Sequence, residues 1–280
     1  MTAAVLSGRD LATRIRAETR EHAAALAAEG RAPGLAIVLA TADESAAWYV
    51  RSIAKAAGQA GINCSIHDLG PDATVAAIGA ALTGLSADQA VHGIILQTPL
   101  PPAAAGAGLA SLITPAKDVD GANPASLGRL AAGLPAFAPA TAEAVLAILD
   151  HYQVTLAGQH AAVIGRSVVV GKPVALLLLS RNATVTICHS RTPDLAAVTS
   201  GADVVVAAAG RPGLVTAEHV RPGATVVDVG TSAAADGSMA GDADAASVSA
   251  KAGALTPVPG GVGPVTTALL LRHTVAAAGQ

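Results

Sequence analysis

Short apolar segments alternate with longer alanine-rich segments along most of the chain. The apolar segments are rich in β-branched residues and bounded by Gly or Pro, which is typical of buried parallel strands; they cover residues 35–40, 62–67, 91–96, 161–164, 184–188, 204–208 and 225–229. The longer segments have helical spacing and cover residues 8–29, 44–60, 72–84, 141–151, 172–181 and 242–251. This alternation predicts right-handed βαβ units and a parallel sheet with helices on both faces.

The alternation forms two series, one before about residue 120 and one after about residue 160. Between them, residues 114–139 are rich in Pro and Gly, and we expect loops there. The chain is therefore predicted to be α/β with two lobes and a hinge near residue 140. A last predicted helix, at 264–278, packs back on the first lobe. The first domain then comprises residues 1–140 and 264–280, and the second comprises 141–263.

Composition narrows the class of protein. Hydrophobic residues make up 52% of the 280 residues and charged residues 13%, with a net charge of −3, which excludes a disordered chain. No apolar stretch is long enough to span a membrane, and the N-terminus reaches charge too soon for a signal peptide. The absence of a basic block argues against nucleic acid. With only Cys64 and Cys188, no disulfide framework is possible, which indicates a reducing cytoplasm.

A glycine turn follows the predicted strand at 161–164. It reads GRSVVVGKP at residues 165–173 and leads into a helix. Such a turn exposes backbone N–H groups and the positive end of the helix, which together attract phosphate. The dinucleotide fingerprint G-x-G-x-x-G is not met, because Ser167 replaces the second glycine. The alternative is a glycine turn that binds no ligand.

The end of the next strand bears on the choice of nucleotide. An NAD site usually has an acidic residue there to bind the ribose 2′-hydroxyl, whereas NADP sites prefer cations and hydroxyls. This chain has Ser190 and Arg191, and Arg166 lies in the glycine turn. These side chains favour NADP over NAD. The alternative is that both arginines are solvated surface charges.

Three polar features stand in loops or at the ends of strands elsewhere in the chain. Gln97 ends an apolar strand and precedes a proline-stiffened loop, where it either serves a site or anchors the loop. The motif KDVDG at 117–121 carries two carboxylates, which by themselves are ordinary turn residues. The segment 256–264 has three prolines and three glycines, and such glycines let a flat ligand approach the backbone.

These features together resemble the bifunctional methylenetetrahydrofolate dehydrogenase/cyclohydrolase family. The resemblance runs nearly end to end and is carried by LQTPLP at 96–101, KDVDG at 117–121, GRSVVVGKP at 165–173, DVG at 228–230 and PVPGGVGP at 257–264. It implies an N-terminal catalytic lobe, a C-terminal Rossmann-like lobe that binds NADP, a tetrahydrofolate substrate between them, and a homodimer. The implied reactions are oxidation of 5,10-methylenetetrahydrofolate by NADP and hydrolysis of the methenyl product to 10-formyltetrahydrofolate.

The resemblance also implies roles for individual residues. Tyr49 would stack on the folate, Gln97 would position the folate and the catalytic Lys, and Asp120 would bind the pterin ring. The loop that would close over the folate contains Pro259, Gly260, Gly261, Val262 and Gly263. The residues that would line the NADP site are Gly165, Arg166, Ser167, Ser190, Arg191 and Thr231.

One departure from the family is decisive for function. The family writes its catalytic helix as Tyr-x-x-x-Lys, and with Tyr49 as the anchor the Lys position is Ile53. Lys55 cannot substitute, because it points about 120° away from Tyr49 on a helix. Ser126 stands where the family has Asn, and the family's Pro-Cys-Thr-Pro block has become PATA at 139–142.

Loss of the Lys should damage hydrolysis more than hydride transfer. Hydride transfer is mostly a matter of positioning, whereas hydrolysis needs a base or a polarised water. The leading hypothesis is an NADP-dependent methylenetetrahydrofolate dehydrogenase with weak or absent cyclohydrolase activity. The alternatives are an NADP-dependent oxidoreductase with another substrate and a catalytically silent family member.

The remaining candidates are expected to be structural. His67, His92, His151 and His160 lack the spacing of metal ligands, so no metal site is expected. Cys64 and Cys188 are expected to be buried thiols, and Trp48 is expected to pack under its helix.

Overall fold

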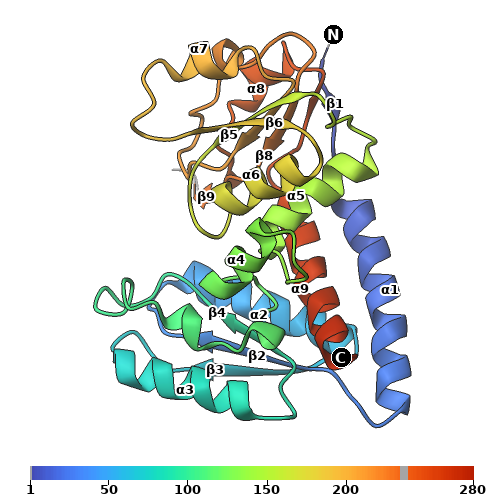
Figure 1. Cartoon of the computed structure of the whole chain (residues 1–280), viewed down its shortest axis with the longest axis vertical. Helices are drawn as coiled ribbons and strands as arrows, with labels where there is room; N and C mark the ends of the chain where they lie inside the picture. The colour runs from blue at the N-terminus through green and yellow to red at the C-terminus, as the bar shows by residue number, and fades with distance from the viewer. Residues whose placement is uncertain (1, 234–238) are drawn as a thin grey trace. The chain divides into compact units, whose positions relative to one another are not determined.

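The computed structural model of the protein describes residues 2–233 and 239–280, which form two compact units (Figure 1). Unit 1 comprises Met1–Ala12 and Thr141–Thr266, and unit 2 comprises Thr13–Ala140 and Thr267–Gln280. Each unit contains a parallel sheet, so the predicted α/β class is confirmed. None of the helices in the described ranges is long and apolar enough to cross a membrane.

Unit 2 is built on a three-stranded parallel sheet with the order β3-β2-β4. Its strands are β2 (Gly34–Leu39), β3 (Asn63–Asp68) and β4 (Gly93–Leu96). Two helices make the crossovers, α2 (Glu44–Gln59) and α3 (Val75–Ala87). The central strand β2 is completely buried. Alternate residues of a strand point to opposite faces, and Ala36 and Val38 of β2 pack in one core with Ile78 and Leu82 of α3.

Unit 1 contains a six-stranded parallel sheet with the order β1-β11-β8-β7-β5-β6. The strands are β1 (Ala4–Val5), β5 (His160–Ile164), β6 (Thr184–Cys188), β7 (Val204–Ala207), β8 (Thr225–Asp228) and β11 (Ala254–Leu255). From β5 the chain adds β6 on one side and then β7 on the other. The strand order therefore reverses between β5 and β7, and in open α/β sheets ligands bind at the carboxyl ends of strands at such a point.

The remaining elements are short or lie outside the sheets. The helices are α1 (Arg9–Ala28), α4 (Pro124–Ala131), α5 (Ala140–His151), α6 (Gly171–Ser180), α7 (Leu195–Thr199), α8 (Ala245–Ser249) and α9 (Val262–Ala278). Single turns of 3₁₀ helix are η1 (Leu109–Leu112), η2 (Pro115–Lys117) and η3 (Ala217–His219), and the short strands β9 (Ser232–Ala233) and β10 (Met239–Ala240) form an antiparallel pair.

All seven predicted strands and all seven predicted helices are present, although most of their boundaries differ by one to three residues. The expectation of loops throughout 114–139 is wrong, because α4 begins at Pro124 with the Asn123 side chain as its N-cap. A proline at the first position of a helix is favourable, so Pro124 starts a helix here. The strands β1 and β11 were not predicted, since two residues show no periodicity. The predicted functional domains, 1–140 with 264–280 and 141–263, stay a prediction.

Two interior assignments also change. Trp48 is 63% exposed, so the expectation that it packs under its helix is wrong. Cys188 is buried as expected, whereas Cys64 is only half-buried.

The carboxylate of Asp118 organises the segment that follows η2. One of its oxygens accepts a hydrogen bond from the N–H of Ala122 at 2.9 Å, and the other accepts from the N–H of Asn123 at 2.9 Å and the hydroxyl of Ser126 at 2.6 Å. Asp118 is fully buried, and a buried carboxylate needs such donors. The first carboxylate of KDVDG is therefore structural, and Ser126 supplies one of the bonds that hold it.

Gly121 lies within this segment and is required there by geometry. Its φ is +61°, and a Cβ at this position would lie 2.4 Å from the backbone nitrogen of Pro139. Gly128, in contrast, lies in α4 and a Cβ there would meet nothing within 4 Å.

Gly121→Ala should lower the free energy of unfolding by about 2–4 kcal/mol, from left-handed backbone strain and the contact with Pro139. Gly128→Ala is the matched control, and it should raise the free energy of unfolding by up to about 1 kcal/mol because Ala favours a helix. Urea denaturation of both variants checks this, and equal effects of the two substitutions would contradict it.

Candidate functional site

In unit 1, the turn between β5 and α6 can be built only with glycine at two positions. Gly165 has a φ of +138°, and a Cβ there would lie 2.1 Å from the carbonyl oxygen of Ala208, which follows β7. A Cβ at Gly171 would lie 2.1 Å from the carbonyl oxygen of Gly165. Both close approaches occur where the strand order reverses, so the glycines bring the backbone together at the expected ligand position.

Backbone donors at this turn are available to a ligand. The Ser167 hydroxyl accepts a hydrogen bond from the N–H of Val170 at 3.1 Å. The N–H groups of residues 166–169 donate to no acceptor among the described residues. They precede the N-terminus of α6, a ten-residue helix, and such donors at a helix N-terminus suit an anion. The turn therefore fits the phosphate groups of a dinucleotide.

The polar residues predicted for the nucleotide lie at the same edge of the sheet. Strand β6 pairs with β5 in parallel, with Ile164 opposite Cys188, so the residues after β6 lie beside the glycine turn. Arg166, Ser190 and Arg191 are all exposed there. Thr231, which follows β8 at this edge, is exposed as well. Two cations and a hydroxyl can hold a 2′-phosphate.

The Pro-Gly loop is also part of unit 1. Its Gly260 has a φ of +108°, and its carbonyl oxygen accepts a hydrogen bond from the N–H of Gly8 at 2.9 Å. Gly260 and Gly261 are buried, whereas Pro259 is exposed. The predicted loop ran to residue 263, but α9 begins at Val262.

Unit 2 contains Tyr49, which lies in the second turn of α2. The Asp43 side chain caps this helix by accepting a hydrogen bond from the N–H of Ser45 at 2.8 Å. Tyr49 is half-buried, and its hydroxyl is hydrogen-bonded to Thr267 of α9. Burial, with a smaller effect from the nearby charge of Asp120, raises the pKa of Tyr49 to about 12. The phenol therefore keeps its proton at neutral pH, and its ring is held from both ends.

Asp120, the second carboxylate of KDVDG, has a different environment from Asp118. Burial and the adjacent charge of Asp118 raise the pKa of Asp120 to about 7, although the charge of His273 and a hydrogen bond from the backbone of Ala140 lower it. A carboxyl group with this pKa exchanges its proton near neutral pH. Such a group is typical of functional sites.

Ile53 lies one helical turn after Tyr49, on the same face of α2. Its side chain is completely buried. Lys55 is exposed. Position 53 is therefore a hydrocarbon contact in the interior, and no ammonium group of α2 stands beside Tyr49 in its place.

Gln97 is the first residue after β4, as predicted. Its N–H donates to the carbonyl of Val38 at 2.9 Å, and its side-chain amide donates to the carbonyl of Thr98 at 2.7 Å. Among the described residues, its side chain makes no hydrogen bond to Tyr49 or Asp120. The predicted residues thus form two sets, with Tyr49, Gln97 and Asp120 in unit 2 and the remainder in unit 1.

Two residues of α9 were missed in the sequence. Thr267 is hydrogen-bonded to the Tyr49 hydroxyl, and the charge of His273 opposes the rise in the pKa of Asp120. Both are far from their partners in sequence. A polar residue within an apolar helix was the only signal that could have found them.

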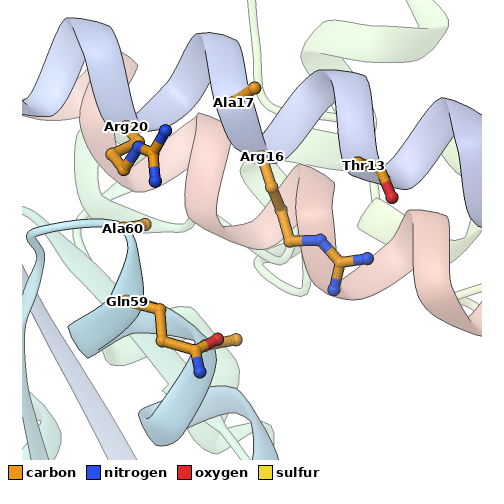
Figure 2. A pocket seen from close by; sticks show the side chains of 7 residues that line it. Thr13, Arg16, Ala17, Arg20, Gln59 and Ala60 are labelled. Atoms are coloured by element: carbon orange, nitrogen blue, oxygen red, sulfur yellow. The ribbon is translucent and has the colours of Figure 1, made fainter.

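A pocket of about 260 Å³ lies between α1 and α2 of unit 2 (Figure 2). Arg16 and Arg20 of α1 line it together with Gln59 and Ala60, at the C-terminal end of α2. Cations at a helix C-terminus complement its dipole, so this pocket has a structural explanation. None of the predicted site residues lines it. In the described part of the chain, no three His, Cys, Asp or Glu side chains gather as metal ligands.

Comparison with known proteins identifies the family. The family model described as tetrahydrofolate dehydrogenase/cyclohydrolase, catalytic domain, matches residues 6–120, and the model for the NAD(P)-binding domain of the same family matches residues 139–280. The bifunctional protein FolD 1 of Saccharopolyspora erythraea is 62% identical over 275 residues, covering 98% of this chain and 94% of that protein.

Solved structures agree with this. The bifunctional FolD enzyme of Campylobacter jejuni matches with a TM-score of 0.96 and 38% identity over 99% of both chains. The methylenetetrahydrofolate dehydrogenase-cyclohydrolase of Trypanosoma brucei, solved with NADP and an inhibitor, matches with a TM-score of 0.94 and 36% identity over 100% of this chain and 98% of that one. The predicted catalytic lobe and Rossmann-like nucleotide lobe are confirmed, and the chain belongs to the tetrahydrofolate dehydrogenase/cyclohydrolase family.

Proposed function

We propose that this protein oxidises 5,10-methylenetetrahydrofolate to 5,10-methenyltetrahydrofolate with NADP, and that its cyclohydrolase activity is weak or lost. The observation that carries the first half is the glycine turn after β5, with its close backbone approaches and unpaired N–H groups. The bound nicotinamide supplies the hydride acceptor. The chain's own residues bind and orient the two reactants, and positioning is the main requirement of hydride transfer.

Two residues of unit 2 are proposed to bind the folate. An ionised Asp120 accepts two hydrogen bonds from an N–C–NH₂ edge of the pterin ring, for which a carboxylate has the right geometry. The Tyr49 ring offers a stacking face, and its bond to Thr267 keeps that face in place. Gln97 is proposed to position the folate, and residues 259–263 to close over it.

The second half of the proposal rests on Ile53. Hydrolysis of the methenyl group requires a base or a polarised water, which contributes about 10²–10⁴-fold to the rate. Ile53 offers only hydrocarbon and is fully buried. Tyr49 holds its proton at neutral pH, since its pKa is about 12, and Asp120 is occupied by the pterin ring. None of these three residues is therefore suited to act as the base.

We further propose a cytoplasmic homodimer. The family resemblance supports the dimer, and the two unpaired cysteines support a reducing compartment. Size-exclusion chromatography with light scattering should give the mass of a dimer. A single species with the mass of a monomer would contradict this proposal.

The function itself is tested by NADPH absorbance with purified protein, NADP and methylenetetrahydrofolate. We expect saturable NADPH formation. A different result is that NADP binds, but methylenetetrahydrofolate does not react and tetrahydrofolate does not raise the melting temperature of the protein. That result would favour an NADP-dependent oxidoreductase that acts on another substrate. If NADP binds and no hydride moves with any folate, the protein is a silent family member.

Folate binding should depend on pH through Asp120. The carboxylate is the binding form, and it is present above the pKa of about 7 and lost below it. The KM for methylenetetrahydrofolate should vary inversely with the fraction of Asp120 that is ionised. It should therefore rise about tenfold from pH 8 to pH 6. Asp120→Asn should raise KM and abolish this dependence. A KM that stays constant across this range in the unsubstituted protein would refute the assignment.

Ile53→Lys should restore some cyclohydrolase activity at a cost in stability. A buried ammonium lowers the free energy of unfolding by several kcal/mol, while its amine can act as the missing base. Ile53→Met is the matched control, since it has similar length and no nitrogen, and it should leave hydrolysis unchanged. The methenyl absorbance follows hydrolysis, and no gain in a folded Ile53→Lys protein would mean that position 53 does not limit the reaction.

Arg166→Ala tests the choice of nucleotide. Loss of a guanidinium beside the 2′-phosphate should raise the KM for NADP about tenfold and leave that for NAD nearly unchanged. Arg181→Ala is the control, because Arg181 is an exposed arginine that pairs with Asp150 at the far end of α6. Steady-state kinetics with both nucleotides measures the effect, and equal losses for NADP and NAD would contradict the assignment.

A further inference from the structure

Two buried aspartates of unit 1, Asp228 and Asp242, bind backbone N–H groups where the strands of the six-stranded sheet end. Asp228 is the last residue of β8, and Asp242 follows β10. Their exposed fractions are 3% and 0%. A buried carboxylate needs donors that compensate for its lost hydration, so the groups that each one binds show what it holds in place.

The Asp242 carboxylate holds the loop that follows β7. Its Oδ2 accepts hydrogen bonds from the N–H of Ala209 at 2.6 Å and the N–H of Gly210 at 2.9 Å. Its Oδ1 accepts a hydrogen bond from the N–H of Arg211 at 2.7 Å. The three donors are consecutive in the chain, and Gly210 between the other two has a φ of +64°. One carboxylate therefore fixes the conformation of residues 209–211.

Asp228 fixes Asp242 in turn. Its Oδ1 accepts hydrogen bonds from the N–H groups of Gly230 and Asp242, both at 2.9 Å, and its Oδ2 accepts one from the N–H of Ala243 at 2.8 Å. A Cβ at Gly230 would lie 2.6 Å from the Oδ1 of Asp242, and a Cβ at Gly241 would lie 2.0 Å from the Oδ2 of Asp228. The two carboxylates are thus packed so closely that neither glycine has room for a side chain.

Stability alone does not favour this arrangement. Burial raises the pKa of Asp228, and the charge of Asp242 adds to the rise, although backbone hydrogen bonds oppose it. Two like charges packed together disfavour their ionised forms. What the pair supplies is position, because an ionised carboxylate has enough lone pairs to bind three N–H groups at once.

Residues 209–211 lie where the strand order of the sheet reverses. They follow β7, which is the neighbour of β5. The N–H of Ala208 donates to the carbonyl of Ile164 at 2.8 Å, and the carbonyl of Ala208 leaves no space for a Cβ at Gly165. In an open α/β sheet the ligand binds between the loops that follow the two strands at such a reversal. The loop 209–211 is therefore the second wall of the nucleotide site, next to the glycine turn.

We propose that Asp242 is a positioning residue for NADP, which holds residues 209–211 in the conformation that binds the nucleotide before the nucleotide arrives. Three N–H groups on one carboxylate leave the loop few alternatives, so little ordering is needed on binding. A loop that adopts this conformation for only a tenth of the time would raise the dissociation constant of NADP about tenfold. The inference goes beyond the proposed reaction, because it concerns how unit 1 binds its nucleotide and requires no folate.

The experiment compares the full-length protein with Asp242→Asn. Asn keeps one acceptor oxygen and turns an NH₂ group toward the remaining N–H donors, so it cannot bind all three. In the protein without nucleotide, amide hydrogen exchange of residues 209–211, followed by NMR, should become at least about tenfold faster. Isothermal titration calorimetry should give a dissociation constant for NADP about tenfold higher. The KM for methylenetetrahydrofolate at saturating NADP should change by less than about twofold.

Asp203→Asn is the matched control. Asp203 precedes β7 at the opposite edge of the same sheet, where its carboxylate accepts a hydrogen bond from the N–H of His160 at 2.8 Å and pairs with Arg221. This substitution also removes a carboxylate that binds the backbone. It should leave the exchange of residues 209–211 and the affinity for NADP unchanged. Equal effects of the two substitutions would overturn the proposal, because they would reflect a general loss of stability.

Gly210→Ala tests the same loop without touching the interior, and it decides the matter if Asp242→Asn does not fold. Gly210 is exposed, and a Cβ there would meet nothing within 4 Å. Its positive φ strains any residue with a Cβ, so Ala should shift the loop and weaken NADP binding several-fold. Gly158→Ala is its control, since Gly158 is exposed, has a φ of +76° and lies before β5 at the opposite edge. Equal NADP affinities of these two variants would contradict the proposal.

The remaining outcomes separate the role of Asp242 from the proposed reaction. Faster exchange of residues 209–211 without weaker NADP binding would overturn the proposal, because the loop would then be held for the fold alone. Unchanged exchange in Asp242→Asn would overturn it as well. If the unsubstituted protein does not bind NADP, both the proposed function and this role fail. If it binds NADP but oxidises no folate, only the proposed function fails.

Discussion

The constraint on which the candidate folate site depends is the placing of two carboxyl groups, the buried Asp118 and the partly buried Asp120, on either side of Val119. Asp118 satisfies its carboxylate with two backbone N–H groups and the Ser126 hydroxyl, and so fixes the segment up to α4. Asp120 follows two positions later and accepts a backbone hydrogen bond from Ala140. The Asp118 carboxylate therefore stabilises the fold. The Asp120 carboxyl group can accept further hydrogen bonds from a ligand.

The two units gather their candidate site residues by the same physical device. In each, a parallel sheet brings the residues after its strands to one edge, so backbone and side-chain groups gather there without being close in sequence. In unit 1 the gathered groups are N–H donors and cations around a glycine turn, which suit phosphate. In unit 2 they include an amide, and the nearby phenol and carboxyl suit a flat ring with a polar edge. An enzyme that transfers hydride between a nucleotide and a pterin needs both kinds of surface.

Much of the fold could be predicted because its central strands, such as β2, β7 and β8, are buried on both faces and are therefore rich in β-branched residues. The glycine turn could be predicted for a similar reason, since the close approach of Gly165 to Ala208 leaves no other residue possible. The two-residue strands β1 and β11 could not, because pairing with distant strands defines them. Helix α4 could not be predicted, because a Pro- and Gly-rich segment indicates loops, although Asn123 caps the helix and Pro124 begins it.

The candidate site was predictable only where it is local in sequence. KDVDG and GRSVVVGKP are continuous motifs. The contact between His273 and Val119, in contrast, joins residues 154 positions apart, and no pattern in the sequence around either residue indicates it. The turn pattern of KDVDG alone, without the family resemblance, could not distinguish its two carboxylates. That distinction arises from Asn123 and Ser126, which fold back on Asp118 alone.

Hydride transfer without hydrolysis is the central claim, and the composition of the products in a single reaction tests it most directly. Purified protein is given NADP and methylenetetrahydrofolate, and NADPH, methenyltetrahydrofolate and 10-formyltetrahydrofolate are quantified over time. The methenyl compound should accumulate mole for mole with NADPH and then decay only at its spontaneous rate. Formation of 10-formyltetrahydrofolate in step with NADPH, with little methenyl compound present, would contradict the loss of cyclohydrolase activity.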